Sequence, residues 1–288
     1  MKKSLSYLPE HKQSELKLIV EKIRERIEPE MIILYGSYAR GDYKEQKDLA
    51  LDRKSGHVSD YDILVVTGEK KTADNASLWH NVTGKWEKLN LSTHVRIIAH
   101  DVQYLNIQLA EGQYFFADIK KEGCMLYDSG NFKLARKRKL IPAEQQRIAQ
   151  DYFDHWFERV QSFSNGYLDA MKRRDNKKAA FELHQATEAS YKAILLVFTG
   201  YNPNEHYLMI LGYMAGKHER ALRDIFPRKT AEQEELFNLL DYAYIGARYD
   251  PDYKITKQQL EYLAERVKNL QRLTKRICKQ RIESFGPD

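Results

Sequence analysis

The chain has 288 residues, of which 42% are hydrophobic and 31% charged, a balance that argues against both wholesale disorder and a membrane protein. Its length exceeds the roughly 100 to 200 residues of a typical domain, so we expect two domains. The net charge of +6 is compatible with nucleotide or nucleic-acid binding but is also common among unrelated proteins. With no apolar signal segment at the start and no run of about 18 apolar residues, we expect a cytoplasmic protein.

The first half of the chain mixes predicted helices and strands. Apolar residues recur at helical spacing over 16–27 and predict an amphipathic helix that stops before Pro29. Strands are predicted at 31–35, 61–66 and 93–99, followed by a short helix near 115–116 and a strand-like run at 123–126. A polar loop covers 41–59.

The second half is predicted to be helical throughout. From Pro142 onward, apolar residues recur every three or four positions and no alternating strand pattern appears. Predicted helices cover 148–163, 181–198, 205–225, 229–247 and 256–280, with Gly200, Pro227 and Pro251 in the breaks. We therefore expect domains at 1–130 and 145–288, joined by a charged linker at 131–144.

The most informative segment is 34–41, which reads Leu-Tyr-Gly-Ser-Tyr-Ala-Arg-Gly. A strand that ends in Gly36-Ser37 at the turn into a helix lets backbone amides approach phosphate oxygens. Farther on, Asp60 and Asp62 lie two residues apart at a strand start and so present both carboxylates to one point. Such oxygen ligands suit Mg²⁺ that carries a triphosphate. Each element alone is common, because Asp-x-Asp is often only a solvated turn.

Together these motifs resemble the nucleotidyltransferase superfamily, whose pattern is an apolar residue before Gly-Ser, then Ala-Arg-Gly, then Ser-Asp-x-Asp. The resemblance covers roughly the first 130 residues and implies an α+β domain with a mixed sheet flanked by helices. It also implies that Gly36 and Ser37 contact a nucleoside triphosphate, with ATP as the expected nucleotide. Asp60 and Asp62 would be metal ligands and catalytic residues for Mg²⁺, and Arg40 would either brace the loop or contact phosphate.

The sequence departs from the family pattern in two places. From Tyr38 to Ser59, 22 residues separate the two motifs, about twice as many as in compact members. This polar excess is a predicted surface insertion that either selects the substrate or is simply tolerated. The second departure is that His94 stands where the family's third carboxylate is expected. A neutral imidazole can accept a proton at pH 7, so His94 is either the catalytic base or an inert replacement.

The second half resembles the HEPN (higher eukaryotes and prokaryotes nucleotide-binding) domain, an all-α helical bundle, in the segments 179–195 and 241–249. Ribonuclease members carry an Arg followed by four to six residues and then a His. Here Arg248 is followed at those distances by Tyr, Lys and Ile, so we expect no ribonuclease activity. Arg248 still offers a planar fork for phosphate and Tyr249 or Tyr253 a ring for a base, unless this segment only packs the helix end.

A polar stripe of His184, Glu188 and Lys192 follows i, i+4, i+8 spacing in the same half. It is read either as a solvated face or interhelical hydrogen-bond set, or as the wall of a nucleotide groove or dimer interface shared with Arg248. The many tyrosines near the end of the chain would suit a partly buried homodimer interface.

The sequence favours a nucleotidyltransferase that moves a nucleoside monophosphate from a Mg²⁺-bound triphosphate to a hydroxyl or phosphate acceptor. That acceptor is a small molecule, a protein or an RNA end. One alternative is a nucleotide-binding or antitoxin-like regulatory module that has lost transfer, so whether the chain is an enzyme stays open. A third is an RNA-binding protein that relies on its basic surface.

Overall fold

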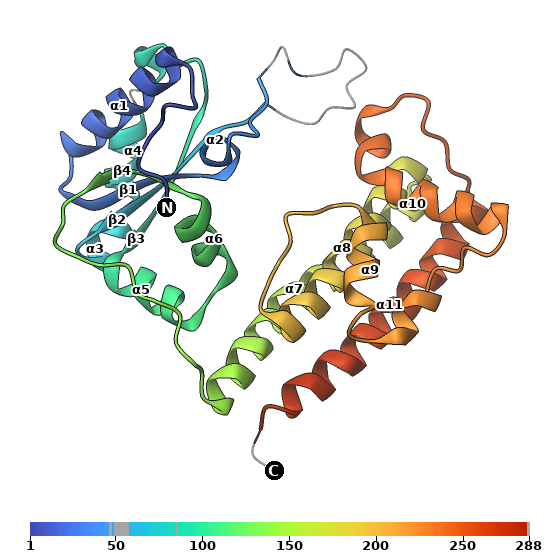
Figure 1. The fold of residues 1–288 in the computed structure, drawn as a ribbon. Coiled ribbons are helices and arrows are strands. Elements are labelled where there is room, and N and C mark those ends of the chain that lie inside the picture. The colour runs from blue at the N-terminus through green and yellow to red at the C-terminus, as the bar shows by residue number, and fades with distance from the viewer. Residues whose placement is uncertain (46–47, 49–57, 85, 287–288) are drawn as a thin grey trace. The chain divides into compact units, whose positions relative to one another are not determined.

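The computed structural model describes residues 1–45, 48, 58–84 and 86–286. Half of the predicted insertion at 38–59, namely 46–47 and 49–57, therefore lies outside the described residues, and the roles considered for the insertion are not tested. The chain divides into two compact units between Lys139 and Leu140, and each unit is described by itself (Figure 1).

The first unit is a mixed four-stranded sheet between two layers of helices (Figure 1). Its elements are α1 (Glu10–Arg24), β1 (Pro29–Tyr35), α2 (Gly36–Arg40), β2 (Tyr61–Thr67), α3 (Lys70–Ala73), α4 (Ala76–Thr83), the 3-10 turn η2 (Trp86–Leu89), β3 (Val95–Asp101), α5 (Val102–Glu111), α6 (Tyr114–Glu122) and β4 (Cys124–Asp128). The strand order is β3-β2-β1-β4, with β2 and β3 parallel and β1 antiparallel to both of its neighbours. The expected α+β domain with a mixed sheet is confirmed.

Side-chain alternation along the strands builds the two hydrophobic layers. On β2, Ile63 and Val65 pack in the layer that contains α1 and α4. Leu64 and Val66 pack in the opposite layer, which contains α5 and α6. Asp62 belongs to this second set by position, so its carboxylate points to the α5 and α6 side of the sheet at the start of β2.

The third strand begins later than the sequence predicted. It was expected at 93–99 but runs from Val95 to Asp101, so His94 lies just before it. The hydroxyl of Thr93 is bound by Lys12 and Tyr38 in the interior, which draws this residue away from the strand ladder. Ladder pairing then starts with Tyr61 opposite Val95.

The second unit is all helical, as expected, with α8 at its centre. It consists of α7 (Pro142–Lys172), α8 (Asn176–Thr199), α9 (Leu208–Ala215), the 3-10 helix η3 (Arg220–Asp224), α10 (Ala231–Tyr249) and α11 (Lys257–Glu283). Helix α8 packs against α7, α9, α10 and α11, which explains why it is buried along most of its length. Among the described residues, no helix is long and apolar enough to cross a membrane.

The single helix predicted over 205–225 is wrong. Helix α9 ends at Ala215, and η3 starts again at Arg220. The side chain of Glu219 accepts a hydrogen bond of 3.0 Å from the backbone nitrogen of Ala221, which caps the new turn. Periodicity alone did not reveal this interruption, because apolar residues continue on both sides of it.

The polar stripe of α8 is buried, so its interpretation as a solvated face is wrong. His184 is 0% exposed, and Glu188 and Lys192 are each 6% exposed. Lys192 Nζ lies 2.8 Å from Glu188 Oε1, and His206 Nδ1 lies 3.1 Å from the same oxygen. Although burial opposes ionisation, the hydrogen bond from His206 and the charge of Lys192 lower the pKa of Glu188 to about 2. The stripe is an interior hydrogen-bonded ion pair.

Buried His184 predicts an acid-sensitive helical unit. Burial lowers its pKa to about 4, whereas an unfolded His titrates near 6.5, so unfolding takes up a proton between these values. Stability should therefore fall as the pH drops from about 6.5 to about 4. We expect His184→Leu to flatten this part of the profile when urea unfolding is followed by circular dichroism. Exposed His155→Leu is the control, and an unchanged slope in His184→Leu would contradict the assignment.

Candidate functional site

The corner between β1 and α2 brings the backbone of Gly36 against the carboxylate of Asp62. Gly36 has a φ of +73°, a left-handed conformation that favours glycine. A Cβ atom on Gly36 would lie only 2.5 Å from Asp62 Oδ2. The strand register explains the approach, because Tyr35 pairs with Asp62 at the end of the antiparallel β1–β2 ladder.

The other predicted phosphate contacts lie on the same short helix. Ser37 is half-buried, and its hydroxyl makes no hydrogen bond to another described residue. Arg40 is exposed and donates through Nε to Asp42 at 3.0 Å, so it braces the turn after α2. Its charge also reaches Asp62, where it favours the ionised carboxylate.

Two carboxylates meet at the start of β2. Burial is the main reason why the pKa of Asp62 is raised, and the negative charge of Asp60 adds to the effect. Arg96 and Arg40 oppose it. The two carboxylates fit one divalent cation. Its positive charge would offset both the burial of Asp62 and the repulsion between Asp60 and Asp62. Within the described residues, no group of three or more His, Cys, Asp or Glu side chains forms a metal cluster, so the fit rests on this pair.

The end of β3 that faces these carboxylates carries basic side chains. His94 Nδ1 lies 3.6 Å from Asp60 Oδ1, and the His94 side chain is 76% exposed. Arg96 pairs with Asp62 in the parallel ladder and places a guanidinium nitrogen 3.5 Å from Asp60 Oδ2. The sequence analysis did not single out Arg96. A signal was present in the sequence, because the strand predicted at 93–99 would place residues 94 and 96 on one face.

The buried ammonium of Lys12 belongs to a hydrogen-bond network that includes α2 and the residue before His94. Lys12 Nζ lies 2.6 Å from Thr93 Oγ1 and 2.9 Å from Glu45 Oε1, in a fully buried position. The hydroxyl of Tyr38, on α2, lies 3.1 Å from the same Thr93 oxygen. Next to Thr93, the carbonyl of His94 accepts a hydrogen bond of 2.8 Å from Tyr61 N. The network therefore fixes α2 and the backbone at His94 together, and sequence periodicity gave no sign of it.

Comparison with known families agrees with the division into two domains. Residues 17–131 match the model of the family described as polymerase beta, nucleotidyltransferase, and residues 153–277 match the HEPN domain. The chain joins a nucleotidyltransferase domain to a HEPN domain. No curated protein gives a significant match.

In the HEPN domain, Arg248 lies among aromatic rings rather than carboxylates. Its guanidinium is centred 4.3 Å from the Tyr244 ring and 4.8 Å from the Tyr249 ring. His206, which Glu188 holds, stacks on Tyr244 at 4.4 Å. Arg248 therefore lies beside the half-buried ring of Tyr249. His206, from the loop between α8 and α9, stacks on the neighbouring Tyr244.

Tyr253 does not fit its suggested role in base stacking. It is buried, and its hydroxyl donates a hydrogen bond of 2.9 Å to the carbonyl of Leu239. Its ring also closes over Gly246, where a Cβ atom would lie 2.8 Å from it. The residue secures the end of α10 instead of offering a ring to a ligand.

Gly36 and Gly130 form a matched pair for testing the corner. Both have positive φ, but nothing lies within 4 Å of a Cβ atom on Gly130. Replacing either glycine with alanine should lower the free energy of unfolding by about 1–2 kcal/mol, because alanine disfavours a positive φ. Only Gly36→Ala must also rotate Asp62 away, so only this variant should lose Mg²⁺-dependent ATP binding in isothermal titration. Equal binding by the two variants would show that the close approach has no role in binding.

Proposed function

We propose that the nucleotidyltransferase domain transfers a nucleoside monophosphate from a Mg²⁺-bound nucleoside triphosphate, with ATP as the expected donor, to a hydroxyl or phosphate acceptor. The observation that carries the proposal is the approach of Asp62 to the backbone of Gly36. This approach supports a site at which the carboxylate of Asp62 and the backbone of Gly36 act on one charged ligand.

Each residue near the corner has a binding role in this proposal. Asp60 and Asp62 would hold Mg²⁺, which when bound neutralises charge on the triphosphate. The free hydroxyl of Ser37 and the backbone of Gly36 would donate to phosphate oxygens. Arg96 lies beside the carboxylates and would contact the triphosphate as a second cation, so the resting ion pair with Asp60 would exchange for a phosphate contact.

In the transfer step, an acceptor oxygen forms a bond to the α-phosphorus while the bond from that phosphorus to the bridging oxygen breaks. Pyrophosphate leaves with the bonding electrons. When the acceptor is a hydroxyl, His94 would take its proton, because the imidazole is exposed and its Nδ1 side faces Asp60. The acceptor is proposed to be a small molecule, a protein or an RNA end, and the functional unit a homodimer.

The basic side chains of His94 and Arg96, at the start of β3, favour a second candidate function. Where the family pattern has a third carboxylate, this chain has His94 and, on the same face, Arg96. Two carboxylates beside two basic groups hold a cation less tightly than three carboxylates do. A nucleotide-binding regulatory module without transfer would use the same contacts, so binding and transfer must be measured separately.

The carboxylate pair is tested by Asp60→Asn/Asp62→Asn in the full chain. Using α-labelled triphosphates and a broad acceptor panel, we expect label transfer to fall at least about 100-fold, because metal positioning is lost. Asp74→Asn, an exposed carboxylate of the same domain, is the control. Transfer that survives in the double variant would refute the proposed site, whereas wild type that binds a triphosphate but labels no acceptor would support the regulatory module.

The role of His94 is tested by His94→Gln, with exposed His11→Gln as the control. If His94 is the base, transfer to a hydroxyl acceptor should fall by about 10²- to 10⁴-fold while triphosphate affinity stays within twofold. Equal rates in the two variants would show that His94 only replaces the missing carboxylate without a chemical role.

A further inference from the structure

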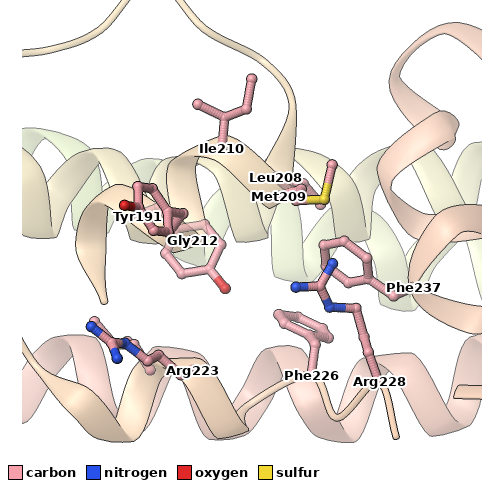
Figure 2. A pocket seen from close by; sticks show the side chains of 11 residues that line it. Tyr191, Leu208, Met209, Ile210, Gly212, Arg223, Phe226, Arg228 and Phe237 are labelled. Atoms are coloured by element: carbon pink, nitrogen blue, oxygen red, sulfur yellow. The ribbon is translucent and has the colours of Figure 1, made fainter. Parts of the chain in front are cut away.

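A cavity of about 780 Å³ lies within the HEPN domain, and none of the residues that the proposed transfer uses lines it. It is bounded by α8, α9, η3 and the start of α10 (Figure 2). The lining side chains are Tyr191, Leu208, Met209, Ile210, Tyr213, Leu222, Arg223, Phe226, Arg228 and Phe237, with Gly212 between them. This volume is within the usual range of small-molecule sites.

Two guanidinium groups line the cavity, and the charge of one of them, Arg228, also acts on the carboxylate of Asp241. Arg228 stacks over the Phe237 ring at 5.1 Å, and Arg223 donates through Nε to the carbonyl of Gly216 at 3.1 Å. Neither forms a salt bridge to another described residue, and Figure 2 shows them at opposite ends of the cavity. Both side chains are exposed and therefore hydrated, and an anion in the cavity could replace that water at a guanidinium group.

A buried phenol also lines the cavity. Tyr191 is 2% exposed, yet its hydroxyl makes no hydrogen bond to any other residue in the described part of the chain. Gly212 leaves room for it, because a Cβ atom there would lie 3.1 Å from the Tyr191 oxygen. The hydroxyl therefore opens into the cavity, where it can donate a hydrogen bond to a polar ligand atom.

The remaining wall is apolar. Leu208, Phe226 and Phe237 are buried, and their side chains form a surface suited to a ring. Met209 and Ile210 are exposed at the rim. Positive groups at the ends of an aromatic cavity match a ligand with an apolar body and a negative group.

We propose that this cavity binds a small organic anion with an apolar ring, whose negative group lies on Arg228 and whose ring lies against Phe226 and Phe237. Tyr191 donates to a polar atom of the same ligand. The residues of this site differ from those of the proposed transfer site, and the proposed binding does not rest on transfer activity.

Two probes with the same ring system test the proposal in the full chain. 8-Anilinonaphthalene-1-sulfonate carries a sulfonate, and N-phenyl-1-naphthylamine lacks it. Fluorescence titration should give at least about fivefold tighter binding of the sulfonate, because it alone can form a charge-assisted contact with Arg228. Equal affinities for the two probes, or no binding of either, would overturn the proposal.

Arg228→Met and Arg266→Met locate the contact. Arg266 stacks over Tyr262 at 5.0 Å, much as Arg228 stacks over Phe237, but it does not line the cavity. Arg228→Met should lose the fivefold preference while still binding the neutral probe, which shows that the cavity remains folded. Arg266→Met and Asp60→Asn/Asp62→Asn should keep the preference. Loss of the preference in Arg266→Met, or its survival in Arg228→Met, would refute the assignment.

Discussion

The antiparallel pairing of β1 with β2 controls the geometry of the nucleotidyltransferase domain. Because the ladder ends with Tyr35 opposite Asp62, the next residue of β1 must pass directly beside that carboxylate. Only glycine fits there, both for its φ and for the space that remains. The backbone of Gly36 and the carboxylate of Asp62 therefore lie side by side, because glycine has no side chain to separate them.

The charge balance at this corner differs from the pattern that the family resemblance implies. A third carboxylate would add repulsion that a bound cation relieves, whereas Arg96 already relieves part of it in the free protein. Repulsion between carboxylates in the free site is therefore weaker than with a third carboxylate, and a bound cation relieves less of it. The missing third carboxylate and the presence of Arg96 both lower the affinity of the site for a metal cation.

Local patterns predicted the elements well and predicted the environment of side chains poorly. The Gly-Ser corner, the mixed sheet and the helical second half followed from strand-length apolar runs and 3.6-residue periodicity. The burial of Glu188 and Lys192 did not, because a polar stripe on a helix reads the same whether it faces water or four other helices. Arg96, Lys12 and His206 were also missed, since each acquires its role from a partner far away in sequence.

Lys12 links two parts of the nucleotidyltransferase domain that the chain order keeps apart. Its ammonium binds Glu45, which lies within the predicted insertion at 38–59, and Thr93, the neighbour of His94. A ligand that pulled Glu45 away would leave a buried cation without its carboxylate, at a cost of about 3–5 kcal/mol. The packing of Glu45 and the backbone beside His94 thus depend on the same buried charge.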